Sequence, residues 1–238
     1  EGVPQWMRWN DYGIGLLRSG ELSNAEAAFA EVEALGRPDG PLNRARVYLA
    51  QGTVQDRAIE ALEQAAAFDP PAPPWLVSLF TGMVNKQNGY LDEAIESFEK
   101  VLTVDSEETR RRGFDFSKDY RLLNELGQTL VERSKLERGP ARAEARRTYL
   151  ERAVELFEQA LAVDPENATS HYNLGLAYRQ LGEPEKSSEH FEAYQKYRVD
   201  DNARDRAIVV ARAENPAADH AADAIVIYDL QREGAYGL

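Results

Sequence analysis

The sequence predicts an all-α fold, a solenoid of about five helix pairs, and three observations lead to this prediction. One pattern of small and aromatic residues occurs three times with the same internal spacing along the 238 residues. Two weaker copies of the pattern fill the intervals between the clear ones. Hydrophobic residues make up 43% of the chain, which is enough for a continuous core, and no apolar run approaches the ~20 residues that a membrane-spanning helix needs.

The repeated pattern places one glycine within a first helix, a second glycine where that helix should end, and a small residue and a phenylalanine in the next helix. The three clear copies contain Gly13, Gly20, Ala25 and Phe29; Gly82, Gly89, Ala94 and Phe98; and Gly175, Gly182, Ser187 and Phe191. A glycine inside a helix costs about 1 kcal/mol relative to alanine. We therefore expect each mid-helix glycine to mark a point where the phenylalanine-bearing helix approaches closely, and each second glycine to end the first helix.

This pattern resembles the tetratricopeptide repeat, a helix–turn–helix unit of about 34 residues. One weaker copy contains Ala45, Tyr48, Gly52 and Ala58, and the other joins Leu126-Gly127 to Ala153 and Phe157. The resemblance implies a right-handed α-solenoid over residues 1–201, and a solenoid needs a terminal cap over its last apolar face. The expected divisions are repeats at about 6–39, 39–71, 75–108, 118–167 and 168–201, a capping helix at 202–215 and an extended tail at 216–238.

The fourth repeat carries an insertion at about residues 132–147, with the sequence ERSKLERGPARAEARR. We expect both helices of this repeat to be about two turns longer than usual and to project beyond the array. Its arginines alternate with Glu137 and Glu144, which favours a pair of exposed, salt-bridged helices; the projection also makes it a second candidate contact surface.

The composition argues against several classes of function. The chain has no cysteine, which excludes disulfides and thiolate chemistry, and its net charge of −13 disfavours nucleic acid as a partner. Its three histidines have no metal-ligand spacing: His171 is expected in a packing or surface role, and His190 is expected to face solvent. No nucleophile elbow or phosphate-binding loop is present, so we predict no enzyme activity, cofactor, metal or membrane insertion for this segment.

The resemblance also implies a concave groove lined by fixed positions of each first helix. Leu76, Leu79, Phe80 and Met83 would form an apolar patch at its centre, and exposed patches of this kind usually mark binding sites. Glu125 and Glu132 stand where a clamp for a terminal carboxylate would need positive charge. The predicted groove residues are Asn10, Ile14, Leu17, Leu76, Leu79, Phe80, Met83, Lys86, Asn124, Gln128, Tyr172, Asn173, Leu176 and Arg179.

The tail ends on a stretch of β-forming residues, AIVIY at 224–228, although almost everything before it predicts helix. We hypothesise that Ile225, Ile227 and Tyr228 dock on the array, in or near the groove, and compete with an outside ligand. The alternatives are an arm accepted by another subunit or domain, which would allow a tail-mediated dimer, and a disordered tail, for which the composition is poor.

The predicted function is a non-catalytic protein–protein interaction scaffold that binds a partner segment in the concave groove. The alternative is the interaction domain of a larger exported enzyme or multihaem electron-transfer protein whose catalytic part is absent from this chain. The chain starts Glu1-Gly2-Val3-Pro4, without an initiator Met or a signal peptide, and its tail resembles those of bacterial repeat proteins fused to multihaem cytochrome segments. No haem-binding Cys-x-x-Cys-His is present, and the composition is compatible with a cytoplasmic and with a periplasmic or exported protein.

Overall fold

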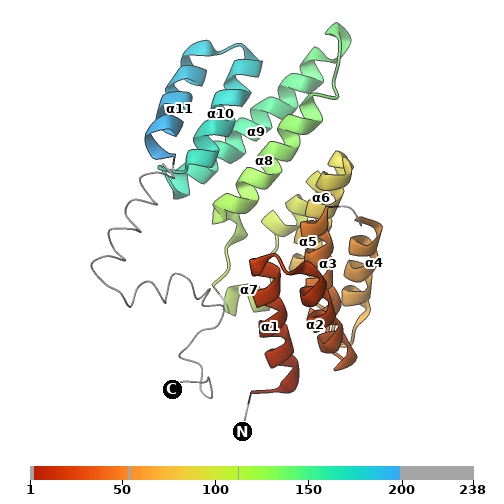
Figure 1. The fold of residues 1–238 in the computed structure, drawn as a ribbon. Coiled ribbons are helices and arrows are strands. Elements are labelled where there is room, and N and C mark those ends of the chain that lie inside the picture. Colours follow the sequence, from red (N-terminus) through yellow and green to blue (C-terminus); the bar gives the residue numbers. More distant parts are fainter. Residues whose placement is uncertain (1–2, 53–54, 112, 199–238) are drawn as a thin grey trace, which may run out of the picture. The chain divides into compact units, whose positions relative to one another are not determined.

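The computed structural model of the chain describes residues 3–52, 55–111 and 113–198 (Figure 1). Within these ranges all regular elements are helices, as the sequence predicts, and neighbouring helices pack in sequential pairs as in an α-solenoid. The described residues form two compact units, unit 1 at residues 3–77 and unit 2 at residues 78–198. The predicted capping helix at 202–215 and tail at 216–238 lie outside the described residues.

Unit 1 contains two complete helix pairs. They are α1 (Gln5–Ser19) with α2 (Leu22–Ala34), and α3 (Asp39–Gln51) with α4 (Gln55–Ala67). Helix α2 also packs against α3, so the second pair stacks on the first. Leu16, Phe29 and Val47 come from three of these helices and belong to one buried apolar cluster, which joins the two pairs through hydrophobic contact.

Unit 2 begins within α5 (Pro74–Asn88), so it contains most of the third helix pair and all of the fourth and fifth pairs. Its helices are α5 with α6 (Leu91–Leu102), the short α7 (Glu107–Arg111) and η1 (Phe116–Lys118), α8 (Tyr120–Ser134) with η2 (Pro140–Arg142) and α9 (Ala143–Val163), and α10 (Ala168–Leu181) with α11 (Pro184–Tyr197). Helix α6 packs against α8, and α9 packs against α10, so each pair contacts the next through its second helix. One buried cluster extends from α6 to α10.

The mid-helix glycines mark close helix contacts, as predicted. A Cβ atom added at Gly127 would lie 2.5 Å from Cε1 of Phe157, and one added at Gly13 would lie 2.6 Å from Cε1 of Phe29. Both phenylalanines are fully buried. The corresponding distances are 2.7 Å between Gly82 and Phe98 and 2.9 Å between Gly175 and Phe191. Because a carbon cannot approach a ring this closely, the pairs keep their spacing only with glycine at these positions.

Glycines also end the first helices at the predicted places. Gly20, Gly89 and Gly182 have φ angles of 81°, 80° and 82°, in the left-handed region that glycine adopts without a steric penalty. The starts of the later helices are fixed by side chains: Asp119 accepts hydrogen bonds from the first backbone amides of α8, and Asn167 accepts one from the amide of Ser170 in α10. These caps set where each first helix begins and therefore which residues face its neighbours.

The insertion in the fourth pair lengthens one helix instead of two. Helix α8 has 15 residues, the same length as α1, whereas α9 has 21, so the prediction of two lengthened helices is wrong for α8. Helix α8 ends at Ser134, and Gly139, with a φ angle of 81°, then turns the chain. The inserted residues form a loop, the short η2 and the first turns of α9 at the tip of the longest described hairpin (Figure 1).

Candidate functional site

The first helices of unit 2 bring several predicted groove residues together between α5 and α8. Met83, Lys86 and Gln87 on α5 and Glu125 and Glu132 on α8 line a shallow hollow of about 400 Å³. Leu79 and Met83 pack partly against the buried core of the unit and are not fully exposed, and of the two Met83 lines the hollow. The hollow therefore combines a small apolar surface with charged and amide side chains.

Lys86 is held in place by two side chains of α8. Its ammonium donates to a carboxylate oxygen of Glu125 (2.9 Å) and to the amide oxygen of Gln128 (3.2 Å), and its side chain is only 17% exposed. The carboxylate of Glu125 therefore neutralises this cation within the site. A partner carboxylate would meet a charge that is already paired, which disfavours a carboxylate clamp at this point.

The asparagines predicted to line the groove of unit 2 bond to each other and to the neighbouring helix. Asn124 Nδ2 donates to Ser170 Oγ (2.9 Å) and to the carbonyl of Tyr120 (2.8 Å). Asn173 Nδ2 donates to Asn124 Oδ1 (3.4 Å), and both asparagines are buried. These side chains fix α8 against α10, so they set the spacing of these two first helices.

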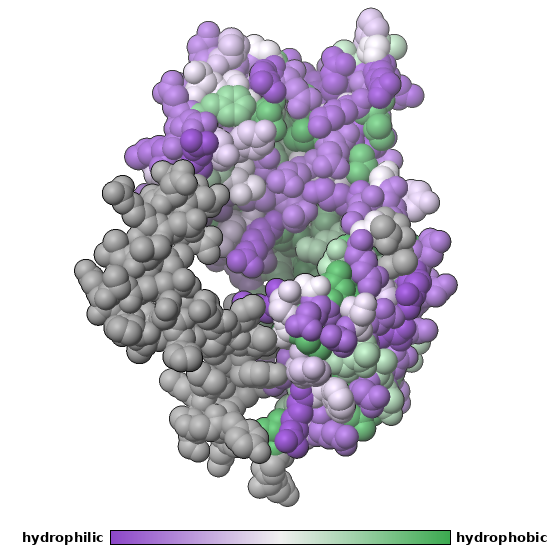
Figure 2. Space-filling view, viewed as in Figure 1, coloured by the Kyte–Doolittle hydropathy of each residue, from purple (hydrophilic) through white to green (hydrophobic). Residues whose placement is uncertain are grey.

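The remaining predicted residues of unit 2 lie on α10 and at the start of unit 2. Tyr172 is 42% exposed and contacts the rings of Phe191 and Tyr194 on α11. Arg179 is exposed, with its guanidinium 5.9 Å from the centre of the Phe191 ring, and Leu176 is partly exposed. Phe80 is partly buried in α5. In Figure 2 the visible face of this unit is mostly hydrophilic, with hydrophobic residues in small, separate patches.

In unit 1 the predicted groove residues pair in the same way. Asn43 Nδ2 donates to Asn10 Oδ1 (2.8 Å), and Asn43 Oδ1 accepts from Arg46 (2.8 Å), which connects α1 to α3. Ile14 and Leu17 pack against the buried cluster of the unit, and Leu76 is partly buried at the start of α5. The tail residues Ile225, Ile227 and Tyr228 lie outside the described residues.

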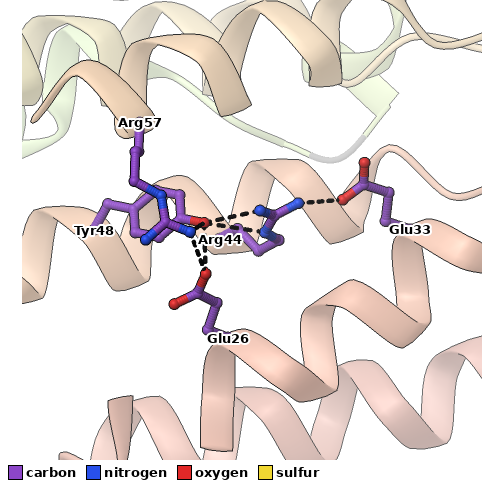
Figure 3. A network of polar contacts seen from close by, with 5 residues as sticks. All are labelled: Glu26, Glu33, Arg44, Tyr48 and Arg57. Carbon is purple, nitrogen blue, oxygen red and sulfur yellow. Dashed lines mark hydrogen bonds and ion pairs between the residues drawn. The ribbon is translucent and has the colours of Figure 1, made fainter. Parts of the chain in front are cut away.

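A polar network that the sequence analysis missed connects three helices of unit 1 (Figure 3). The buried hydroxyl of Tyr48 donates to Glu26 (2.8 Å) and accepts from Arg44 (2.9 Å) and Arg57 (2.8 Å). Arg44 also pairs with Glu33 at 2.6 Å. The pKa of Tyr48 is raised by burial and by its bond to Glu26, which outweigh the opposing effect of Arg44.

A histidine pair in unit 2 was also missed. Nδ1 of His171 lies 3.0 Å from Nδ1 of His190, and Nε2 of His171 lies 3.1 Å from the carbonyl of Pro165. The prediction that His190 faces solvent is wrong: its ring is half-buried and stacks on Tyr178, with 5.5 Å between the ring centres. Burial, and secondly the neighbouring His171, lower the pKa of His190.

The described residues contain no cluster of three or more His, Asp or Glu side chains that could hold a metal ion. None of the described helices is long and apolar enough to cross a membrane. The polar groups at the predicted groove positions instead form hydrogen bonds and ion pairs between neighbouring helices.

Known proteins similar to this chain share its repeats and its fold. Family models described as "TPR repeat" and "Tetratricopeptide repeat" match residues 149–182 and residues 81–108 and 168–198, respectively. These matches end at residue 198, so they give no support to the tail's resemblance to cytochrome-fused proteins. Comparison with curated protein sequences gives no match.

Several solved structures of MamA have a similar fold. "MamA 41-end from Desulfovibrio magneticus RS-1" is 16% identical with a TM-score of 0.59, and the match covers 83% of this chain and 97% of that one. "Crystal structure of MamA protein" is 15% identical with a TM-score of 0.57, covering 81% and 91%. A structure of "MamA AMB-1" is 22% identical with a TM-score of 0.54, covering 81% and 98%. At these identities the likeness concerns the fold alone.

The glycine–phenylalanine contacts, the sequential helix pairs and the matched repeats agree with one another. Together they show that residues 81–108 and 149–198 contain tetratricopeptide repeats, within a chain whose described residues have a helical-repeat fold.

Proposed function

We propose that the chain is a non-catalytic protein–protein interaction scaffold that binds a segment of a partner protein on the concave face of unit 2. The observation that carries this proposal is the hollow between α5 and α8, where Met83 lies among Lys86, Glu125 and Glu132. Small apolar anchors surrounded by charged side chains are typical of peptide-binding surfaces.

The geometry of the hollow supports binding without rearrangement. The bonds of Asn124 to Ser170 and of Lys86 to Glu125 connect α8 to both of its neighbouring first helices. Side chains that are already ordered lose less conformational entropy when a partner binds. The concave face is therefore preorganised, and the partner meets a surface whose shape is set by the fold.

The charges of the hollow favour a neutral or basic segment with an apolar side chain. Glu125 already neutralises Lys86, which leaves the carboxylate of Glu132 to attract a partner cation. Met83 offers a flexible apolar contact for an aliphatic or aromatic anchor. An apolar residue beside lysine or arginine fits both features.

The experiment is to pan a displayed library of random peptides against residues 1–238 and to measure the affinities of the enriched peptides. We expect these peptides to combine an apolar residue with lysine or arginine. Glu132→Lys should weaken their binding several-fold, whereas Glu96→Lys makes the same charge change on the exposed face of α6 and should not. Equal effects of both variants, or enrichment of acidic peptides at this face, would contradict the proposal.

The same peptides test whether the tail competes for the site. A chain that ends at residue 216 should bind them more tightly if residues 217–238 occupy the concave face. Unchanged affinity, with unchanged circular dichroism, would rule out competition by the tail while leaving the proposed function in place.

A further inference from the structure

The tip of the α8–α9 hairpin carries a concentration of positive charge in a chain whose net charge is −13. Lys135 and Arg138 are exposed and their side chains form no hydrogen bond or ion pair with a described residue, and the same holds for the partly exposed Arg146. Arg142 contacts Glu137 only loosely, at 3.7 Å. Other exposed cations of unit 2, such as Lys100, Arg147 and Lys186, each pair with a glutamate.

A partly buried arginine fixes this tip to the start of α6. Arg133 donates from Nε to Asp92 and from Nη1 to Glu137, both at 2.7 Å, and its guanidinium lies 5.0 Å from the centre of the Tyr149 ring. The side chains of Arg133 and Glu137 are only 17% and 11% exposed. The carboxylate of Glu137 is therefore already paired with Arg133. It neutralises little of the positive charge that Lys135, Arg138 and Arg142 bring to the loop.

A hollow of about 510 Å³ lies between this tip and the turn that precedes α6. Tyr90 and Leu136 form two of its walls, and each is 56% exposed although it is a large hydrophobic residue. Arg138 and Arg142 also line the hollow. Two exposed apolar walls beside two arginines form a surface that can hold an apolar side chain while its neighbours meet cations.

We propose that this hollow is a second docking site, separate from the concave face, which binds an acidic segment of a partner protein. A leucine or phenylalanine of the segment would lie between Tyr90 and Leu136, and the flanking carboxylates would pair with Arg138 and Arg142. Arginine is suited to this role because its planar guanidinium donates to two carboxylate oxygens at once. The partner differs in charge from the one expected at the concave face, so the two sites select different segments.

The shape of the surface favours a polypeptide over an anionic membrane. The apolar walls line a depression, whereas a lipid bilayer meets a protein through a protruding apolar surface. Asp92 and Glu93 also line the hollow, and a continuous layer of anionic headgroups could not avoid their charge. A short peptide can direct its few carboxylates to Arg138 and Arg142 while its apolar residue lies between Tyr90 and Leu136.

The test uses residues 1–238 and short labelled peptides in which a Leu or a Phe is flanked on both sides by Asp and Glu. We expect saturable binding that weakens as salt is added, and a loss of about tenfold in affinity for Arg138→Glu/Arg142→Glu. Leu136→Asp should weaken binding by a similar factor. Both changes are on exposed side chains, so circular dichroism should show an unchanged fold.

The matched control is Arg110→Glu/Arg111→Glu, which reverses two exposed charges on α7, away from the residues that line the hollow. It should retain the affinity of the unchanged protein. An equal loss in this control would mean that the peptides respond only to net charge and would overturn the proposal. Absence of peptide binding would also overturn it, as would binding to phosphatidylserine vesicles without binding to peptides.

Discussion

Two tyrosines, one in each unit, occupy the same position in their helix pairs. Tyr48 and Tyr178 both lie on a first helix, four residues before the glycine that ends it. Each hydroxyl donates to a glutamate on the second helix of the preceding pair: Tyr48 to Glu26 at 2.8 Å, and Tyr178 to Glu158 at 2.7 Å. The repeat therefore places the same bond between pairs in both units.

The surroundings of the two hydroxyls differ. Arg44 and Arg57 both donate to the oxygen of Tyr48, and Arg57 also pairs with Glu26 at 2.6 Å (Figure 3). At Tyr178 the ammonium of Lys186 lies over the ring, 4.9 Å from its centre, and His190 stacks on the ring. The repeat fixes the backbone and the hydrogen bond from tyrosine to glutamate. The residues around this bond differ, so the contact between neighbouring pairs, here called the junction, contains ion pairs in unit 1 and an aromatic stack with a titratable histidine in unit 2.

The largest expected difference comes from removing each hydroxyl. Tyr48→Phe leaves two arginine donors and one carboxylate without their shared partner, and we expect a loss of about 2 kcal/mol in the stability of unit 1. Tyr178→Phe removes one bond to a glutamate that is exposed and can bond to water, so the loss should be about 1 kcal/mol or less. Hydrogen exchange of the amides in α2–α4 and in α9–α11 measures each unit separately. Equal losses in the two units would show that the arginines contribute nothing to the junction.

Mildly acidic pH should affect unit 2, which contains the histidine pair, more than unit 1. Burial and His171 lower the pKa of His190 below its ordinary value of 6.5, although Glu158 and Glu189 partly oppose the effect. The folded state therefore disfavours the charged ring. The stability that comes from keeping the His190 ring neutral is fully present above about pH 6.5, and it is lost as the pH falls through the lowered pKa.

We expect the protection of α10 and α11 against hydrogen exchange to decrease between about pH 7 and pH 5. Nε2 of His171 is positioned to donate to Pro165, so its Nδ1 is left to accept from Nδ1 of His190, and a second proton on His190 would place a positive charge on a half-buried ring. His190→Gln is the matched variant, since it keeps a polar side chain and cannot titrate. If the variant shows the same decrease, the histidine pair is not its cause.

The fold was predictable because its main signal is local. Gly13 and Phe29, or Gly127 and Phe157, contact each other within a single helix pair, so their spacing in the sequence predicts their contact in space. The length of α8 was not predictable in the same way. Glycine and proline mark a turn at residues 139–140, but they do not determine that the helix already ends at Ser134.

The site was predicted less well because its contacts join different pairs. Position within the repeat identifies which side of a helix Asn124 and Asn173 occupy, but not that they bond to each other across α8 and α10. The network of Tyr48 joins Glu26 to Arg57, which are 31 residues apart. The half-buried position of His190 likewise depends on two residues of the preceding helix. Only a fixed register between neighbouring helices brings such residues together.

The third prediction compares the two phenols at high pH. Burial, together with the bond to glutamate, raises the pKa of both Tyr48 and Tyr178 above the ordinary value of 10.0. In the folded protein these two phenols should therefore ionise above the ordinary tyrosine pKa. Their contribution to stability is present below about pH 10 and is lost as the pH rises through the raised values.

Ultraviolet difference absorbance during an alkaline titration measures this order. Tyr48→Phe and Tyr178→Phe should each remove part of the late step, which is the absorbance change above the ordinary tyrosine pKa of 10.0. A late step that survives in both buried variants would assign it to other tyrosines and weaken the comparison.

The smallest expected effect comes from changing the cation beside each tyrosine. Arg57→Lys keeps the charge but cannot reproduce the two-sided contact of the guanidinium with Glu26 and Tyr48. Because the Arg57 side chain is 49% exposed, solvent screening should limit the loss in unit 1 to about 0.5 kcal/mol.

The reciprocal change, Lys186→Arg, should leave unit 2 unchanged within measurement error, because the ammonium contacts the face of the ring and not the hydroxyl. Thermal unfolding of each variant, followed by hydrogen exchange in the affected unit, provides the measurement. A gain in unit 2 that matched the loss in unit 1 would show that the aromatic junction can be converted into an ionic one by one side chain. No gain would mean that closing the junction also requires an arginine on the tyrosine's own helix, as Arg44 is in unit 1.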